Sequence, residues 1–332
     1  MTPAAAIPIF LASVALMLGA AAVFAGKLDH MGIRLGWPET LLGLLTALAA
    51  DAPELVSAIT ALVEKRHAEA VGVVVGASAF NLAAMLGLSA VVAARIRARH
   101  EALEVEAFVG LWIVAVSLAV VAGGIAAGAG LVLVVLVAVP YVFLLACGPM
   151  RVRRLPFGVG RTRLIRRSFG ELHQRERTLD SRREIAGLIL VLVVALCLII
   201  LGGIATVRTA NFLADAWSVP EEIVGVIVLA ILSALPNAWT GVRFGLQQRG
   251  SALMSETLNS NSINLGVGIT VAATLGSLGT LTHLDVFDIS WLLGMTVIAV
   301  VLFGRRGGGG RVAGAVLIAL YAVFVAVQFA TS

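Results

Sequence analysis

The sequence contains a long internal repeat. Residues 46–91 recur without a gap 183 positions later, at 229–274. Aligned identities include Ala47 with Ala230, Pro53 with Pro236, Arg66 with Arg249, Asn81 with Asn264, and Leu82 with Leu265. A repeat of this length indicates that two parts of the chain adopt the same local structure. The aligned Pro and Asn pairs indicate that residues uncommon in apolar segments stand at the same places in both parts.

The chain is too apolar for a soluble domain. It has 332 residues, of which 60% are hydrophobic and 13% charged, and its mean hydropathy is +1.02. These values are typical of a polytopic membrane protein. The net charge of +5 does not indicate nucleic-acid binding, because the arginines stand in short loops between apolar runs. Cys147 and Cys197 lie inside apolar runs, which gives neither a disulfide framework nor a metal-binding spacing.

We expect an all-α protein with ten membrane-spanning helices, because a span needs about 20 mostly apolar residues. The expected spans are 4–26, 38–62, 70–93, 106–126, 130–149, 185–206, 221–246, 253–274, 286–303 and 312–330. The first could be confused with a signal peptide, but the stretch from Met1 to Ala6 carries no basic residue. We therefore expect it to remain as a helix.

The basic residues predict how these spans are oriented. With the N-terminus outside, all but three of the 24 Lys and Arg residues fall on the cytoplasmic side, the exceptions being Lys65, Arg66 and Arg208. Both termini then lie outside the plasma membrane, and Asp285 and Asp288 lie near the outer face, where we expect them to be solvated. The second five spans enter from the side opposite to the first five, which predicts two inverted five-helix repeats.

Three regions follow from this pattern. We expect a first five-helix repeat at 1–150 with its core at 38–93, an Arg-rich cytoplasmic loop at 151–184, and a second repeat at 185–332 with its core at 221–274. The loop is expected to be a solvated linker that sets the topology, and an amphipathic helix on anionic lipid is the alternative. Inverted repeats of this kind are typical of secondary transporters, whose binding site lies where the repeats meet.

Asp51 and Glu54 are the residues most out of place in an apolar span. They are three positions apart, so both carboxylates share one helix face. Two carboxylates this close in hydrocarbon resist joint ionisation unless a cation lies between them. Pro53 lacks an N–H and leaves the carbonyl of Ala49 without its helical partner, and Pro236 is expected to act likewise. Carboxylates and free carbonyls together favour a hard cation such as Na⁺ or Ca²⁺.

Neutral oxygen ligands extend this pattern. Asn81 ends a face of small residues on the next span, and the second copy is crowded with polar residues: Ser255, Glu256, Asn259, Ser260, Asn261, Ser262 and Asn264. Glu256, Ser260 and Asn264 step by four and share a face. A single Asn or Ser in a membrane helix more often forms a hydrogen bond between two helices than a contact with a ligand. For Glu256 three roles remain open: a gate, a rim charge and a ligand.

The motifs resemble those of the cation/Ca²⁺ antiporter superfamily, of which the Na⁺/Ca²⁺ exchangers are a branch. Its alpha repeats follow G-T-S-x-P-E on one helix and G-N-x-x-G-S-N-x-F-N/D on the next. The corresponding segments here are A-A-D-A-P-E at 49–54, G-V-V-V-G-A-S-A-F-N at 72–81, L-S-A-L-P-N at 232–237 and S-E-T-L-N-S-N-S-I-N at 255–264. The resemblance implies the same inverted ten-helix architecture.

The resemblance also implies a ligand set. Glu54 would be the central carboxylate and Asn81 an amide ligand, while Ala47 and Ala230 would offer backbone carbonyls. The remaining candidate cation-binding residues are Asp51, Ser233, Asn237, Glu256, Ser260 and Asn264.

Four of these positions depart from the family pattern. Asn237 stands where the family has a second Glu, Asn264 where many members have Asp, Asp51 where Ser is usual, and Glu256 where Asn is usual. The negative charge of the site is therefore concentrated on one helix. Two ionised carboxylates neutralise the charge of one Ca²⁺ or of two monovalent cations.

We therefore predict a secondary active cation antiporter, most similar to Na⁺/Ca²⁺ exchangers. It would work by alternating access, with spans 1 and 6 sliding past a core of spans 2, 3, 7 and 8. The expected partners are inorganic cations and the lipid bilayer, with no cofactor and no enzymatic reaction. One alternative is a proton-coupled divalent or monovalent cation antiporter, and another is a transport-inactive paralogue that acts as a membrane scaffold or regulator. The sequence leaves the transported ion, the stoichiometry and the oligomeric state open.

Overall fold

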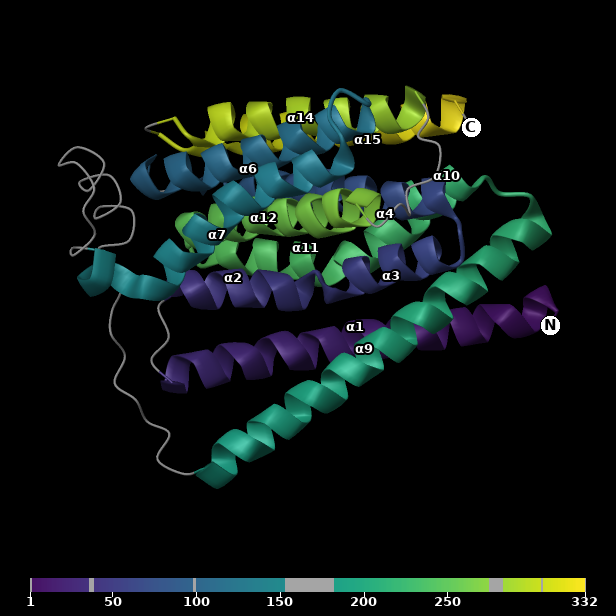
Figure 1. Ribbon diagram of the computed structural model, residues 1–332, viewed down its shortest axis with the longest axis horizontal. Helices are drawn as coiled ribbons and strands as arrows, with labels where there is room; N and C mark the ends of the chain where they lie inside the picture. Colours follow the sequence, from purple (N-terminus) through teal and green to yellow (C-terminus); the bar gives the residue numbers. More distant parts are fainter. Residues whose placement is uncertain are drawn as a thin grey trace.

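The computed structural model describes residues 2–35, 39–97, 100–152, 182–274, 283–305 and 307–331, which are almost entirely helical. Most of the helices run along one common axis (Figure 1). Both chain termini lie at one end of the bundle, called here the terminal end, whereas α7 ends and α9 begins at the opposite end, called the loop end (Figure 1). The predicted Arg-rich loop lies outside the described residues, except for 151–152 and 182–184.

Eight helices of the described residues are long and apolar enough to cross a membrane. They are Pro3–Gly32, His67–Val92, Leu103–Val121, Ala127–Leu144, Glu184–Trp217, Glu221–Leu246, His283–Phe303 and Arg311–Thr331. The expected spans at 38–62 and 253–274 are not among them. The helix of the first is divided at Asp51 into two short pieces, and polar residues make the second less apolar than a typical span. The chain is therefore a multi-pass membrane protein.

Two long helices, α1 (Pro3–Leu35) and α9 (Arg182–Trp217), cross each other on one side of the bundle (Figure 1). Both extend beyond the spans expected at 4–26 and 185–206. Small residues bring them together: a Cβ added to Gly202 would lie 3.0 Å from the backbone nitrogen of Met17. At the loop end Arg34 and Glu184 form an ion pair at 3.6 Å, which joins α1 to α9.

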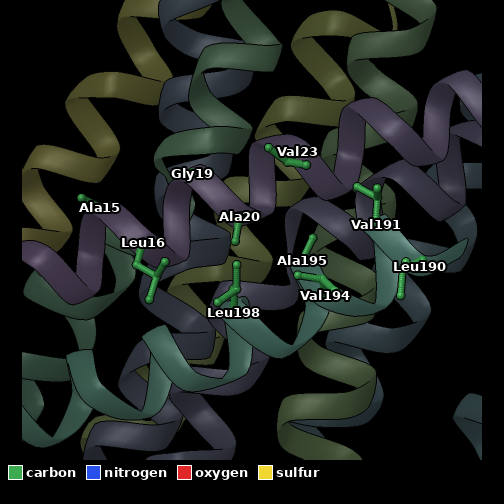
Figure 2. Close-up of a pocket in the computed structure, with 10 residues that line it drawn as sticks. All are labelled: Ala15, Leu16, Gly19, Ala20, Val23, Leu190, Val191, Val194, Ala195 and Leu198. Carbon is green, nitrogen blue, oxygen red and sulfur yellow. The ribbon is translucent and has the colours of Figure 1, made fainter. Parts of the chain in front are cut away.

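The two helices also meet through a buried hydrogen bond, which Thr206 of α9 donates to Ser13 of α1 at 3.0 Å, and through apolar side chains. A hollow of about 510 Å³ between them is lined only by Ala, Gly, Leu and Val residues of the two helices (Figure 2). Several large side chains around it are exposed, among them Leu16, Val23 and Leu190. This outer face of the two helices is therefore suited to contact with hydrocarbon.

The inner bundle is built from the two copies of the sequence repeat. The first copy forms α2 (Glu39–Ala50), α3 (Ala52–Val63), α4 (His67–Asn81), the π-helical η1 (Leu82–Leu88) and α5 (Ser89–Val92). The second forms α10 (Glu221–Ile223), the π-helical η2 (Val224–Leu229), α11 (Ala230–Leu246), α12 (Gly250–Ile263), the π-helical η3 (Asn264–Val271) and α13 (Ala272–Thr274). Helix α4 packs against η2, where a Cβ on Gly72 would lie 3.0 Å from the nitrogen of Val226. Glycine therefore permits close contact between the copies.

The two copies share local backbone geometry at the same offset of 183 residues. Lys65 and Gln248 occupy the left-handed region, with φ of 63° and 58°. The next residues, Arg66 and Arg249, are the N-caps of α4 and α12, with φ of −93° and −91°. The π-helical segments η1 and η3 follow these two helices at corresponding places. The sequence repeat is thus also a structural repeat.

A scaffold of four helices covers the other side of the inner bundle (Figure 1). These are α6 (His100–Val121), α7 (Ala127–Val152), α14 (His283–Phe303) and α15 (Arg311–Thr331). Two short strands, β1 (Arg95–Ile96) and β2 (Gly309–Gly310), pair antiparallel between α5 and α15. The main hydrophobic core lies between this scaffold and the inner bundle, so α4 and α12 are deeply buried.

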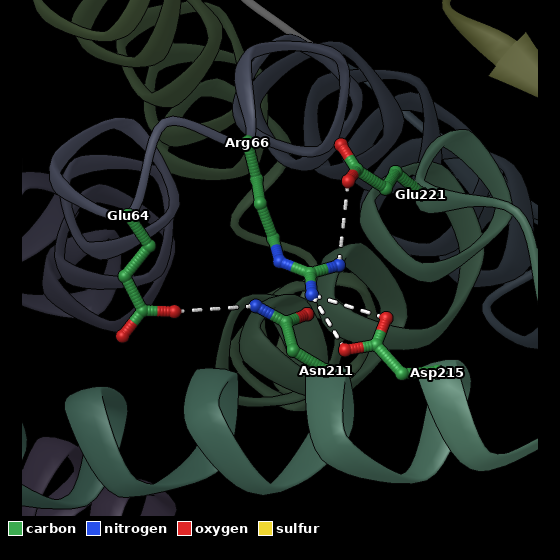
Figure 3. A network of polar contacts seen from close by, with 5 residues as sticks. All are labelled: Glu64, Arg66, Asn211, Asp215 and Glu221. Atoms are coloured by element: carbon green, nitrogen blue, oxygen red, sulfur yellow. Dashed lines mark hydrogen bonds and ion pairs between the residues drawn. The ribbon is translucent and has the colours of Figure 1, made fainter.

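Polar side chains bind α9 to the inner bundle at the terminal end (Figure 3). Arg66 donates to both carboxylate oxygens of Asp215 on α9, at 2.8 and 3.1 Å, and to Glu221 at 3.4 Å. Glu64 accepts from the Nε of Arg208 at 2.9 Å. Together these bonds connect the C-terminal part of α9 to the turn between α3 and α4.

The Arg66–Asp215 pair permits a first prediction. The side chain of Asp215 is 62% exposed, so solvent screening limits what the pair contributes. We expect a double-mutant cycle with Arg66→Gln and Asp215→Asn to give a coupling energy of about 0.5–1 kcal/mol. Chemical unfolding of the purified protein in mild detergent would measure it. A coupling energy of zero would show that the pair contributes nothing to stability.

Candidate functional site

The inner bundle has a helix break at Asp51. Helix α2 ends at Ala50 and α3 begins at Ala52, with Pro53 in its first turn. The N–H of Asp51 still bonds to the carbonyl of Ala47 at 2.8 Å. Pro53 has no N–H to offer the carbonyl of Ala49, so the helical pattern is interrupted where the two acids lie.

Pro236 differs from Pro53 in its effect. It lies inside α11, which continues from Ala230 to Leu246, so Pro236 does not stand beside a helix break as Pro53 does. The irregular backbone of the second copy lies earlier, in the π-helical η2. Pro236 still lacks the N–H that would bond to the carbonyl of Leu232, so this carbonyl is left without its helical partner although α11 continues.

Asn237 joins the two acids across the two copies. Its Nδ2 donates to Oδ1 of Asp51 at 2.8 Å and to Oε1 of Glu54 at 3.0 Å. All three side chains are at most 1% exposed. One amide nitrogen of α11 therefore holds one oxygen of each carboxylate of the first copy.

Ser260 and Asn81 extend this contact. The hydroxyl of Ser260 on α12 donates to Oδ1 of Asp51 at 2.7 Å, and Nδ2 of Asn81 on α4 donates to the Oγ of Ser260 at 2.9 Å. Both residues are fully buried. We call Asp51, Glu54, Asn81, Asn237 and Ser260 the central cluster. It brings together side chains from four helical segments and from both copies of the repeat.

The central cluster retains acceptor oxygens that have no donor. These buried atoms are Oδ2 of Asp51, Oε2 of Glu54, Oδ1 of Asn81 and Oδ1 of Asn237. An unpaired buried acceptor costs about 1–3 kcal/mol, and a charged one costs more. Four oxygens without donors within one hydrogen-bonded cluster are suited to a hard cation, which replaces the missing donors.

The other predicted ligands are buried but do not bond to the central cluster. Ala47 and Ala230 are 0% exposed, and the hydroxyl of Ser233 donates to the carbonyl of Ala230 at 3.3 Å. Both polar side-chain atoms of Asn264 are buried without a partner. Glu256 is 5% exposed, and its Oε2 is also unpaired. The structure therefore assembles five of the ten candidates and places the others in the same buried region of the bundle.

Within the described parts of the chain, no group of three or more His, Cys, Asp and Glu side chains lies close enough together to hold a metal ion. The central cluster instead combines two carboxylates with two amides and one hydroxyl. Such a set contains only oxygen ligands, which suit Na⁺ and Ca²⁺ better than Zn²⁺ or copper.

A second buried polar network was not predicted from the sequence. Glu106 on α6 accepts from the hydroxyl of Ser255 at 2.6 Å, and Nδ2 of Asn259 donates to the same hydroxyl at 3.3 Å. The hydroxyl of Tyr141 on α7 donates to Oδ1 of Asn259 at 2.8 Å. This network joins α12 to the scaffold. Glu106 stands at the start of an expected span, where its burial has no local sequence signal.

The expectation that Asp285 and Asp288 are solvated is wrong. They are only 8% and 5% exposed, and Nε2 of Gln328 on α15 donates to Oδ1 of Asp288 at 2.5 Å. The cause is the close packing of α14 against α15, which covers the first turn of α14.

The chain matches a known protein family over most of its length. The family model described as "Sodium/calcium exchanger protein" matches residues 5–146 and 187–330. The chain belongs to the sodium/calcium exchanger family. A search of curated proteins gave no match to this chain.

Solved structures share the fold of this family member at low sequence identity. It is similar to the sodium-calcium exchanger NCX_Mj, with a TM-score of 0.62 and 17% identity over 98% of this chain and 99% of that one. It is similar to the H⁺/Ca²⁺ exchanger CAX, with a TM-score of 0.74 and 13% identity over 96% of this chain and 81% of that one. It is also similar to YfkE, with a TM-score of 0.63 and 16% identity over 95% and 90%.

The bridging amide of Asn237 permits a prediction about stability. Asn237→Ala removes both of its bonds to the carboxylates, so Oδ1 of Asp51 and Oε1 of Glu54 each lose a donor. Because a hydrogen bond to a charged group contributes about 1.5–3 kcal/mol, we expect the variant to lose about 2 kcal/mol or more. Tryptophan fluorescence during chemical unfolding in detergent would measure the loss.

Ser233→Ala is the matched control for this variant. Ser233 is as buried as Asn237 and lies on the same helix, but its hydroxyl bonds only to its own backbone. We expect this control to change stability by less than about 1 kcal/mol. Equal losses in the two variants would contradict the bridging role of Asn237.

Proposed function

We propose that this protein is a secondary active antiporter that exchanges Ca²⁺ against Na⁺ in the plasma membrane. The observation that carries the proposal is the central cluster, in which two buried carboxylates share one amide nitrogen and each keeps an oxygen without a donor. Membership of the sodium/calcium exchanger family supports the same function. The carboxylates would bind the cation, and no covalent chemistry is required of them.

The charge of the central cluster supports exchange of one divalent ion against monovalent ions. Asp51 and Glu54 together carry two negative charges when both are ionised, and Asn81, Asn237 and Ser260 are neutral. One Ca²⁺ or two Na⁺ neutralise that charge. The empty and doubly charged site is costly to move through a dry barrier, and this cost couples the movement of one ion to that of the other.

We propose alternating access as the mechanism, with α1 and α9 sliding across the inner bundle. The two helices pack mainly against each other and less against the inner bundle, which supports their movement as one pair. The offset of 183 residues that relates both sequence and backbone geometry supports ten helices arranged as two inverted fives, and the placement of the Lys and Arg residues supports both termini outside. In that arrangement the two copies would exchange conformations when the site opens to the opposite side of the membrane.

Proton coupling is the second candidate, and the geometry of Asn237 favours it. Oδ1 of Asp51 and Oε1 of Glu54 lie within 3.0 Å of the same nitrogen, so their negative charges are close together. Protonation of one carboxylate relieves this repulsion when no cation is bound. A proton would then compete with Ca²⁺ in the place of Na⁺.

The role of the carboxylates can be tested by transport. We expect Asp51→Asn and Glu54→Gln each to reduce ⁴⁵Ca²⁺ flux in proteoliposomes by at least 100-fold, because each removes half of the charge that holds the ion. Glu106→Gln is the matched control, since Glu106 is also a buried acid but bonds to Ser255 in the scaffold. Unchanged flux in both cluster variants would refute this site.

The coupling ion can be identified by imposing one gradient at a time. We expect ⁴⁵Ca²⁺ uptake by proteoliposomes loaded with Na⁺ at equal pH on both sides, and little uptake with a pH gradient in the absence of Na⁺. The reverse result would establish proton coupling. Absence of flux under every gradient, together with absence of Ca²⁺ binding by calorimetry, would indicate a transport-inactive relative.

A further inference from the structure

Glu256 is a buried acid on α12 that the central cluster does not include. Its residue is 5% exposed, and its Oε2 is buried without a hydrogen-bond partner. It precedes Ser260 by four residues, so the two side chains share one face of α12. The rise of the helix places Glu256 about 6 Å from Ser260 along the axis, toward the loop end.

Two charged residues have opposite electrostatic effects on the carboxylate of Glu256. Asp51 of the central cluster repels its charge, and Arg249 attracts it. Arg249 is the exposed N-cap of α12, and its guanidinium lies 4.7 Å from the ring centre of Phe244. Arg249, Glu256 and Ser260 therefore form a series along α12 that leads from the helix start to Asp51.

Glu106 of α6, which lies beside α12, is an example of a buried acid with a purely structural role. Helix α12 packs against α6 on one side and against α2 on another. Toward α6, Ser255 donates to Glu106, so this buried carboxylate oxygen has a donor at 2.6 Å. Glu256 is the next residue along the chain and faces elsewhere, and its Oε2 has no donor. A carboxylate that only joined helices would have a partner there.

We propose that Glu256 forms a second cation-binding site, which receives a hard cation between the loop end and the central cluster. The cation would occupy the unpaired Oε2 and then pass along the face of α12 to Asp51 and Glu54. Asn264 lies two turns beyond Glu256 on the same helix, and its two polar side-chain atoms are unpaired as well. The proposal rests on the proposed function, because it assigns a further residue to the path that serves the central cluster.

Binding of ⁴⁵Ca²⁺ to the purified protein tests this proposal without transport. We expect the double variant Asp51→Asn/Glu54→Gln to retain saturable Ca²⁺ binding with a Kd raised at least tenfold. Adding Glu256→Gln should abolish the remaining binding, whereas adding Glu106→Gln should leave it within twofold. Thermal unfolding of each variant would confirm that it is folded. A double variant without saturable binding, or a Glu256→Gln triple variant that binds as the double variant does, would overturn the proposal.

A rate measurement in the otherwise unchanged protein gives a second test, which does not depend on folding of the multiple variants. We expect Glu256→Gln to slow Ca²⁺ association at least fivefold in stopped-flow measurements. Glu256→Asp, which keeps the charge, should restore the rate to within twofold of the unchanged protein. Equal rates for the unchanged protein and Glu256→Gln would overturn the proposal. Loss of flux in the central-cluster variants tests the proposed function separately.

Discussion

The amide nitrogen of Asn237 is the contact on which the arrangement of this protein depends. It holds one oxygen of Asp51 and one of Glu54, and so it joins the two copies of the repeat at the point where the chain carries buried negative charge. Without this bond Asp51 would keep the hydroxyl of Ser260 as a side-chain donor, and Glu54 would lose the amide that links it to Asp51. With it, the acids are oriented so that their second oxygens remain unpaired and available to a cation.

The rest of the fold serves to keep this contact dry and close. Glycines on α4 and η2 let the backbones of the two copies approach each other, and the scaffold covers α12 through the Glu106 network. The π-helical segments η1 and η3 continue the helices on which Asn81 and Ser260 lie, and they occur at corresponding positions of the two copies. Burial of polar groups is therefore concentrated in the inner bundle, whereas α1 and α9 present apolar side chains outward.

The sequence predicts the repeat, the helical class and the central carboxylates, because each has a local signal. The offset of 183 residues aligns Pro53 with Pro236, and it therefore places Asn237 opposite the acid pair. The burial of Asp288 and the partner of Glu106 could not be predicted, since each depends on a residue on another helix, Gln328 and Ser255. Whether a helix breaks beside its proline differs between the copies, since Pro53 stands next to a break and α11 continues through Pro236. Propensity at the proline itself does not reveal this.

The bonds of Arg66 and Glu64 to α9 lie only at the terminal end, and the Arg34–Glu184 pair at the loop end joins α1 to α9 and not to the inner bundle. Among the described residues, the polar bonds of the crossed pair to the inner bundle therefore lie at the terminal end. Toward the loop end, Leu28 and Met31 of α1 pack on Ala49 of α2 through apolar side chains. In the alternating access proposed above, the pair would pivot at the terminal end and be displaced most at the loop end, toward which Glu256 lies.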